Sequence, residues 1–213
     1  MTYYDEISEC VLKGELEKVK EYVNKSLEEG DQPRAIIDNG LLAGMAVVGR
    51  LFKAGDMFIP EVMRSAQTMA NAMTILEPLI VGSGTGTVKA KVLMGTVKAD
   101  LHNIGKDLVS MMLRSSGFEV KDIGVDVPKE RFMSAVMEYK PDILGLSALL
   151  TTTMPAMRDT VAYLNAGESR STYKIIVGGA PVTRQFAEEI HADGYAPDAG
   201  STVEEVEHLL GMG

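Results

Sequence analysis

Apolar residues in the first third of the chain recur at helical spacing. Between residues 2 and 79 they return every three or four positions, as Ile7, Val11 and Leu12 do, without the alternation of a half-buried strand. This period places apolar side chains along one face of a helix. Glycine and proline clusters divide the pattern into four predicted helices, near residues 2–13, 15–29, 33–54 and 60–80. Four such helices are enough for a small bundle.

The pattern changes beyond residue 89, where short apolar runs alternate with helical segments. The runs predict strands at residues 91–97, 119–125, 142–148 and 174–177, with a weaker strand at 194–196. Helices are predicted between and after them, at residues 105–117, 128–139, 155–166, 182–192 and 202–210. This alternation is typical of right-handed βαβ crossovers and a doubly wound parallel sheet. Five strands fit the flavodoxin-like order 2-1-3-4-5.

Two domains are therefore expected in this α/β chain. A four-helix bundle would occupy residues 1–87, and a Rossmann-like domain with a five-stranded parallel sheet would occupy residues 88–213. Residues 81–90 are rich in glycine, serine and threonine, which cannot pack a core, so we predict a linker there.

Charge and composition exclude several classes of partner. The 213 residues include 30 acidic and 21 basic side chains, a net charge of -9, and no basic stripe that would bind a phosphate backbone. Cys10 is the single cysteine, so an internal disulfide is excluded. The apolar stretches look shorter than the about 20 residues of a membrane span, and the first residues do not resemble a signal sequence. We expect a cytoplasmic protein that binds neither nucleic acid nor a membrane.

The most distinctive motif is Asp100-Leu101-His102-Asn103-Ile104-Gly105, which follows the first predicted strand of the sheet. Ligands of such folds settle at the carboxyl edge of the strands. An imidazole that binds a metal usually donates its second N–H to a carboxylate, and Asp100 is placed for that role. No set of ligands completes a zinc site. A single histidine suits a metal whose other positions are filled by a macrocycle, although a histidine that merely braces its loop is the alternative.

Two further loops reach the same edge of the predicted sheet. Ser147-Ala148-Leu149 ends the third strand, and Gly178-Gly179 ends the fourth. The missing Cβ atoms would leave a slot, and Ser147 with the threonines of residues 151–153 offers hydroxyls to a neutral polar ligand. The threonine run is equally typical of a helix N-terminus before Pro155. A nucleotide loop is disfavoured because neither Gly-x-Gly-x-x-Gly nor a Walker pattern is present.

In this order, Asp100-x-His102-x-x-Gly105, Ser147-x-Leu149 and Gly178-Gly179 resemble the fingerprint of cobalamin-binding domains. Those domains hold the cofactor base-off, with a histidine on cobalt. Residues 44–62 are similar to the helical cap of methionine synthase and of the small corrinoid proteins of methylamine, methanol and glycine-betaine methyltransferase systems. The two resemblances together cover nearly the whole chain.

The resemblance implies a role for each matching residue. His102 would be the lower ligand of cobalt, Asp100 would hydrogen-bond it, and the Thr153 hydroxyl would extend this relay. Ser147 and Thr151 would contact the tail that carries the dimethylbenzimidazole. The implied cofactor-binding residues are Asp100, His102, Ile104, Gly105, Ser147, Leu149, Thr151, Thr153, Gly178, Gly179 and Ala199 in the sheet domain, with Phe52 and Ile59 of the bundle shielding the upper face.

The resemblance also implies a methyl carrier of one-carbon, anaerobic metabolism that is not itself a catalyst. A substrate-specific corrinoid methyltransferase would load a methyl group onto Co(I). A second methyltransferase would pass it from methyl-Co(III) to tetrahydrofolate or a thiol such as coenzyme M, and a reductive activase would restore the cobalt. Two alternatives share the histidine motif. A small subunit of a radical mutase would not require the helical domain, and a cobalamin-dependent regulator would require an output module and, to bind DNA, a basic patch.

Overall fold

The computed structural model describes residues 2–81 and 88–212. The described residues form two compact units that divide near residue 88. The linker predicted for residues 81–90 falls mainly on residues 82–87, which lie outside the described residues.

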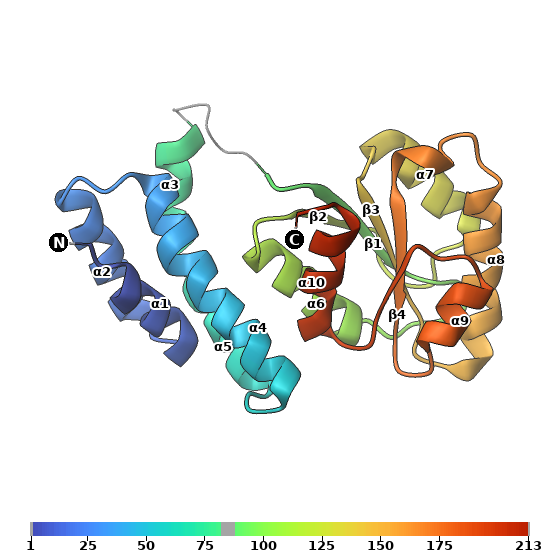
Figure 1. Cartoon of the computed structure of the whole chain (residues 1–213), viewed down its shortest axis with the longest axis horizontal. Coiled ribbons are helices and arrows are strands. Elements are labelled where there is room, and N and C mark those ends of the chain that lie inside the picture. Colours follow the sequence, from blue (N-terminus) through green and yellow to red (C-terminus); the bar gives the residue numbers. More distant parts are fainter. Residues whose placement is uncertain (1, 82–87, 213) are drawn as a thin grey trace. The chain divides into compact units, whose positions relative to one another are not determined.

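The first unit is helical (Figure 1). Its elements are α1 (Tyr4–Lys13), α2 (Leu16–Glu28), α3 (Pro33–Ile36), the π-helical segment η1 (Ile37–Leu42), α4 (Ala43–Ala54) and α5 (Ile59–Val81). Pro33 occupies the first turn of α3, where its missing N–H costs no hydrogen bond. Gly14 and Gly55 end α1 and α4 with positive φ angles of 70° and 81°. The helix predicted over residues 33–54 is thus continuous, with one π-helical segment inside it.

The helix from Pro33 to Ala54 has the predicted bounds, but it is more apolar than we expected. By length and composition alone, its 22 residues could cross a membrane. However, Ile36, Leu41, Met45 and Val48 on this helix are buried in the unit, and its segments pack against α1 and α5. Such burial is typical of a core helix in a helical unit.

The second unit contains a five-stranded, all-parallel sheet with strand order β2-β1-β3-β4-β5 (Figure 1). The strands are β1 (Lys91–Thr96), β2 (Glu119–Asp122), β3 (Ile143–Ser147), β4 (Lys174–Gly178) and β5 (Gly194–Ala196). The predicted doubly wound, flavodoxin-like topology is confirmed. Because all strands run in one direction, the loops that follow them meet at one edge of the sheet.

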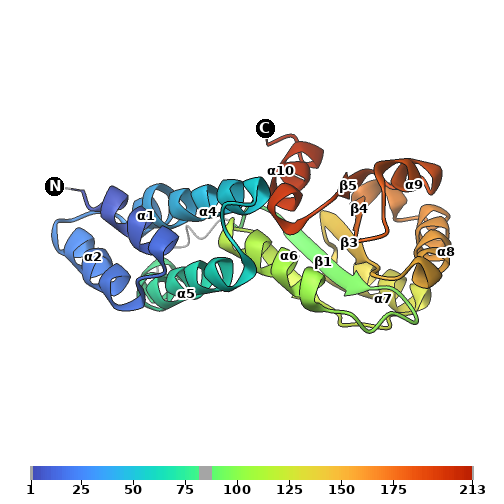
Figure 2. The ribbon, with the colours of Figure 1, turned by 90° about the horizontal axis from the view of Figure 1, so that it is seen from below.

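Helices cover both faces of this sheet. They are α6 (Ile104–Ser115), α7 (Lys129–Tyr139), α8 (Met154–Asn165), α9 (Arg184–Glu189) and α10 (Ala199–Leu209), with short 3-10 turns η2 (Thr151–Thr153) and η3 (Arg170–Thr172). Figures 1 and 2 show α6 and α10 on one face and α7, α8 and α9 on the other. Successive strand residues alternate between two cores: Met94 and Ile176 belong to the α6 and α10 side, and Leu93 and Val177 to the opposite side.

Candidate functional site

The loop after β1 is fixed at several points. The Asp100 backbone N–H donates to the Val97 carbonyl over 3.2 Å, and the Asp100 carbonyl accepts from the Asp126 N–H over 2.9 Å. The Thr96 hydroxyl donates to the His102 carbonyl over 3.0 Å. Ala99 has a positive φ of 66°, and its N–H donates to an Asp126 carboxylate oxygen. These bonds hold the loop in one conformation and turn the Asp100 side chain into the protein.

The Asp100 carboxylate is completely buried and accepts four hydrogen bonds. One oxygen accepts from the His102 backbone N–H over 3.1 Å and faces the imidazole Nδ1 at 2.7 Å. The other accepts from the Leu149 N–H and the Thr153 hydroxyl, both over 2.7 Å. Burial alone would raise the pKa of Asp100, but these donors outweigh burial and hold the pKa well below its usual range. Asp100 is therefore a carboxylate at neutral pH.

This arrangement assigns the tautomer of His102. Since Nδ1 lies against an ionised acceptor, it carries the imidazole proton, and the lone pair is on Nε2. The side chain is 49% exposed and lines a cavity. The structure thus holds one imidazole in a fixed orientation, with Nε2, a nitrogen that could bind a metal, on the side away from Asp100. In the part of the chain that the structure describes, no cluster of three His, Cys, Asp or Glu side chains could hold a metal ion.

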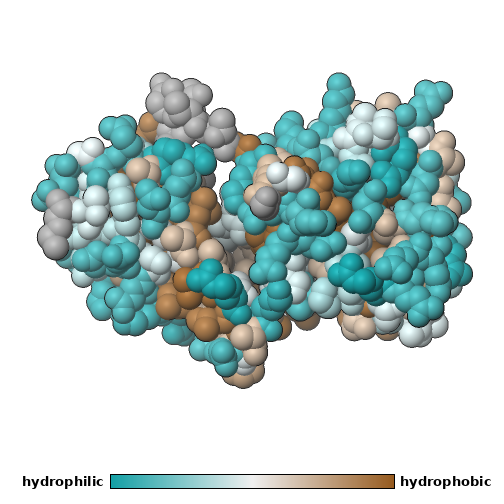
Figure 3. Space-filling model, viewed as in Figure 1, coloured by the Kyte–Doolittle hydropathy of each residue, from teal (hydrophilic) through white to brown (hydrophobic). Residues whose placement is uncertain are grey.

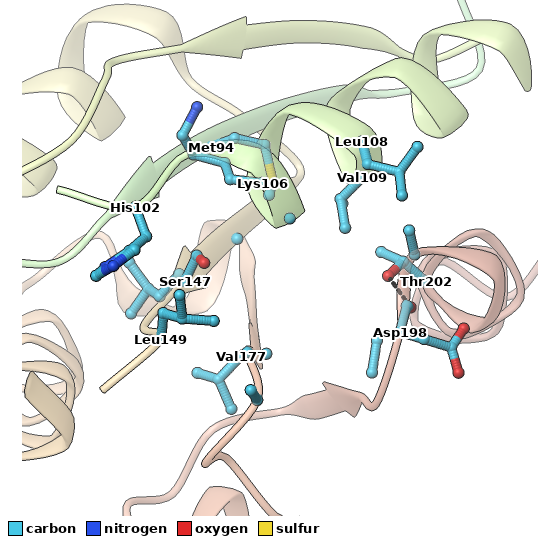
Figure 4. Close-up of a pocket in the computed structure, with 18 of the residues that line it drawn as sticks. Met94, His102, Lys106, Leu108, Val109, Ser147, Leu149, Val177, Asp198 and Thr202 are labelled. Carbon is cyan, nitrogen blue, oxygen red and sulfur yellow. Dashed lines mark hydrogen bonds between the residues drawn. The ribbon is translucent and has the colours of Figure 1, made fainter. Parts of the chain in front are cut away.

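The cavity has a volume of about 500 Å³ and lies at the carboxyl edge of the sheet, bordered by α6 and the start of α10. In Figure 4, Asp198 and Thr202 lie across it from His102. Its lining comprises Met94, Leu101, His102, Asn103, Ile104, Gly105, Lys106, Leu108, Val109, Gly145, Leu146, Ser147, Leu149, Ile176, Val177, Gly178, Gly179, Ala180, Ala196, Pro197, Asp198, Ala199 and Thr202. A volume of this size is typical of a small-molecule or cofactor site.

Most residues singled out in the sequence meet at this cavity. The lining includes His102, Ile104, Gly105, Ser147, Leu149, Gly178, Gly179 and Ala199. Asp100 and Thr153 do not line it. Asp100 contacts the His102 imidazole directly, and the Thr153 hydroxyl is linked to His102 through its hydrogen bond to Asp100. Thr151 is exposed in η2 and is not among the lining residues. The three threonines thus differ, because only Thr153 is buried.

Phe52 and Ile59 belong to the helical unit, and their expected contact with the cofactor stays a prediction. Ile59 is 41% exposed at the start of α5, next to Phe58, which is 68% exposed, and near Met63, which is 54% exposed. Figure 3 shows apolar side chains at the surface of the helical unit over α4 and α5. This unit therefore presents an apolar surface around one of the two residues.

The three glycines of the motifs serve different purposes. A Cβ atom at Gly105 would meet nothing within 4 Å, so its absence leaves the start of α6 open. A Cβ at Gly178 would lie 3.0 Å from the Ala196 carbonyl oxygen. Gly179 has a φ of 128°, and a Cβ there would overlap the Ala148 carbonyl oxygen. Gly179 is therefore required by the close approach of two backbones, in addition to any role in forming a slot.

Several lining residues were not predicted from the sequence. Met94, Gly145 and Ile176 come from the middle of β1, β3 and β4, and Val109 and Thr202 come from α6 and α10. The sequence carried one signal for the strand residues. Gly145 and Ile176 precede the motif residues Ser147 and Gly178 by two positions, and residues two apart on a strand share a face.

Comparison with known proteins assigns this fold and cavity to a family. Residues 90–207 match the model of a B12 binding domain, and residues 3–77 match a second model with the same description. The chain belongs to the B12-binding proteins. The resemblance predicted from its motifs is thus confirmed, and a corrinoid is the cofactor that this family binds.

Similar proteins match over most of their length. Dimethylamine corrinoid protein 2 of Methanosarcina acetivorans is 43% identical over 96% of this chain and 94% of its own. A corrinoid protein of Desulfitobacterium hafniense is 38% identical over 99% of both chains. Among solved structures, a cobalamin-binding protein from Desulfitobacterium hafniense has a TM-score of 0.82 and 31% identity, covering 97% of this chain and 98% of its own. A chain of the methanol:cobalamin methyltransferase complex of Methanosarcina barkeri matches with the same score and identity, covering 96% and 78%.

Proposed function

We propose that this protein is a corrinoid methyl carrier that works between two methyltransferases. It would bind the corrinoid base-off, with His102 Nε2 as the lower axial ligand. A substrate-specific methyltransferase would load the methyl group, and a second one would transfer it to tetrahydrofolate or a thiol such as coenzyme M. The observation that carries this proposal is the His102–Asp100 pair beside a cavity of about 500 Å³ in a B12-binding fold.

The residues at the site fit a base-off corrinoid. His102 offers one nitrogen with its partner nitrogen anchored, Gly105 leaves open space at the start of α6, and the cavity beside them can take the displaced nucleotide tail. Ser147 supplies a hydroxyl to this lining, whereas Leu149, Gly178 and Ala199 supply apolar contacts. When bound, the corrinoid supplies a cobalt ion that carries the methyl group.

The chain's own contribution is to orient the ligand nitrogen and hold a proton. Asp100 keeps the Nδ1 proton of His102 in place, and the Thr153 hydroxyl and the Leu149 N–H hold Asp100. Whenever Nε2 is not bound to a metal it can accept a proton, and the buried Asp100 carboxylate then stabilises the imidazolium. Proton uptake at His102 would then accompany release of the metal from Nε2.

The relatives support a methyltransferase partner for this chain. They include dimethylamine corrinoid proteins and a structure of a methanol:cobalamin methyltransferase complex. By analogy, we propose a methylated amine or alcohol as the source of the methyl group, a reductive activase as a third partner, and a cytoplasmic location. The role proposed for Phe52 and Ile59, shielding the upper face, rests on the resemblance of residues 44–62.

Electron paramagnetic resonance of the Co(II) form tests the axial ligand. Full-length protein reconstituted with cobalamin should show superhyperfine coupling to one nitrogen, and labelling histidine with nitrogen-15 should change each triplet into a doublet. His102→Ala should lose this coupling, whereas His208→Ala, an exposed histidine on α10, should keep it. Triplets that persist in the labelled wild-type protein would show that dimethylbenzimidazole remains on cobalt, and the proposal would be wrong.

A further inference from the structure

Three neighbouring strands form a deep layer of the cavity. Met94 pairs with Gly145 across β1 and β3, and Gly145 pairs with Ile176 across β3 and β4. All three residues line the cavity. Ser147 and Gly178, which pair with each other two positions further along, also line it. Since two strand residues span about 7 Å, the lining descends from Ser147 and Gly178 at the edge to Met94 and Ile176 within the sheet.

Met94 lies directly over Gly145. A Cβ atom at Gly145 would overlap Met94 Sδ and would lie 2.9 Å from Met94 Cε and 3.8 Å from Ile176 Cγ2. The end of the methionine side chain thus occupies the space that any larger residue at position 145 would need. Met94 is only 5% exposed. The thioether and the Ile176 side chain together form the floor of the cavity.

This floor is apolar. The polar groups of the lining either are paired with other protein groups or lie away from the floor. Ser147 is at the edge of the sheet, at the end of β3. The Lys106 ammonium is paired with Asp107 and Asp122. The Thr202 hydroxyl donates to the Asp198 carbonyl over 2.8 Å. Next to the floor, α6 contributes the aliphatic side chains of Leu108 and Val109.

We propose that Met94, seated over Gly145, determines which lower base this protein accepts. The floor selects corrinoids whose base ends in an apolar edge, such as a methylated benzimidazole, over bases that end in a hydroxyl or an amine. This inference rests on the proposed base-off binding. Each buried methyl group should raise affinity about fourfold, and a hydroxyl or amine left without a partner at the floor should lower affinity about tenfold.

Titration of the full-length apoprotein tests the selectivity. The probes are cobalamin, its benzimidazole, 5-hydroxybenzimidazole and adenine analogues, and cobinamide, which has no lower base. Dissociation constants come from absorbance changes. We expect cobalamin to bind most tightly, the benzimidazole analogue next, and the hydroxylated and adenine forms most weakly. Tighter binding of either polar base than of the benzimidazole analogue would overturn the proposal.

Substitutions at the floor separate this role from folding. Gly145→Ala should push the Met94 thioether into the cavity and weaken cobalamin binding about tenfold, with no change for cobinamide. Met94→Ala should reduce the methyl preference to less than about twofold, because the methyl groups lose their contact surface. In the double variant, the new Cβ fills the space vacated by the thioether, so the loss caused by Gly145→Ala should be reversed.

Two additional variants keep the test decisive. Met157→Ala removes a completely buried methionine from the core on the opposite face of the sheet, and it should leave the order of the four bases unchanged. Met94→Gln, of similar shape, should shift the preference toward the hydroxylated base, and it provides the test if Met94→Ala does not fold. An unchanged order in the folded Met94 variants, or an equal loss of cobinamide binding in Gly145→Ala, would show that the pair is only structural. Failure of the proposed function would give a different result, because no corrinoid would then bind through His102 in any variant.

Discussion

At the scale of single residues, Asp100 connects two loops that are far apart in the sequence. Its carboxylate contacts His102 in the loop after β1 and the Leu149 N–H and Thr153 hydroxyl after β3. A carboxylate can accept all of these bonds, because it presents two acceptor oxygens and no donor. An amide cannot, because one of its two terminal groups donates. The negative charge of Asp100 is therefore needed both to connect the two loops and to orient His102.

Asp100→Asn should lower the free energy of unfolding of the apoprotein by about 1–3 kcal/mol at pH 7, because an N–H2 group would face buried donors. The folded-state pKa of Asp100 lies below its unfolded value of about 3.9. The stabilisation from the carboxylate is thus present above pH 4 and lost as the pH falls toward the folded pKa. The difference between wild type and variant should be constant from pH 7 to about pH 5 and shrink below about pH 4, measured by denaturant unfolding with circular dichroism. The exposed Asp159→Asn should show no comparable loss, and a difference independent of pH would contradict this account.

The residues of the site differ in how far the sequence could predict them. Asp100 and His102 are two positions apart in one loop, so their pairing was visible as a motif and the structure shows it. Thr153 stands 53 positions from Asp100, and only the family resemblance linked the two. Met94 and Gly145 look like ordinary strand residues, and only the sheet register brings them together. Their contact therefore could not be predicted from local pattern.

At the scale of elements, an ion pair attaches the start of α6 to the end of β2. The Lys106 side chain is 2% exposed, and its ammonium contacts Asp122, the last residue of β2, and Asp107. Lys106 also lines the cavity. Because α6 begins only two residues after His102, this ion pair also positions the loop that carries His102. Burying an ammonium is costly unless its partner remains in place.

Asp122→Asn should therefore destabilise the protein more than Lys106→Met does. The first change leaves a buried ammonium with only the half-exposed Asp107, at a cost of about 3 kcal/mol. The second change removes the charge and keeps an apolar side chain of similar length, so we expect a loss of less than about 1 kcal/mol. The asparagine oxygen can still accept from the Gly124 N–H, as Asp122 does. Thermal unfolding of the apoprotein measures both, and a greater loss in Lys106→Met would show that the charge itself is favourable there.

The ends of some helices differ from the predicted ends because capping side chains and backbone angles determine them. The last helix was predicted from residue 202 but begins at Ala199, since the Asp198 side chain accepts from the Ser201 N–H over 2.7 Å. The helix predicted over residues 182–192 is only Arg184–Glu189, because Thr183 caps its start and His191 has a positive φ of 59° beyond its end. Hydrophobic periodicity located both helices, but side-chain caps and single backbone angles set their limits.

At the scale of the whole molecule, every described residue that lines the cavity belongs to the sheet unit. The lining residues lie between Met94 and Thr202, and the two hydrophobic cores of the sheet consist of residues between Ala90 and Leu210. The cores are therefore complete without the helices of the first unit. A unit with its own core is expected to fold independently.

A fragment of residues 88–213 should thus fold and bind cobalamin through His102. We expect its dissociation constant to stay within about tenfold of that of the full chain, because the imidazole, its hydrogen bonds and the cavity are all retained. Circular dichroism tests folding, and the nitrogen-15 resonance experiment tests axial ligation. His102→Ala in the same fragment is the matched control and should lose the coupling. A fragment that folds but keeps dimethylbenzimidazole on cobalt would show that the helical unit is needed to displace the base. The site would then require both units rather than the sheet unit alone.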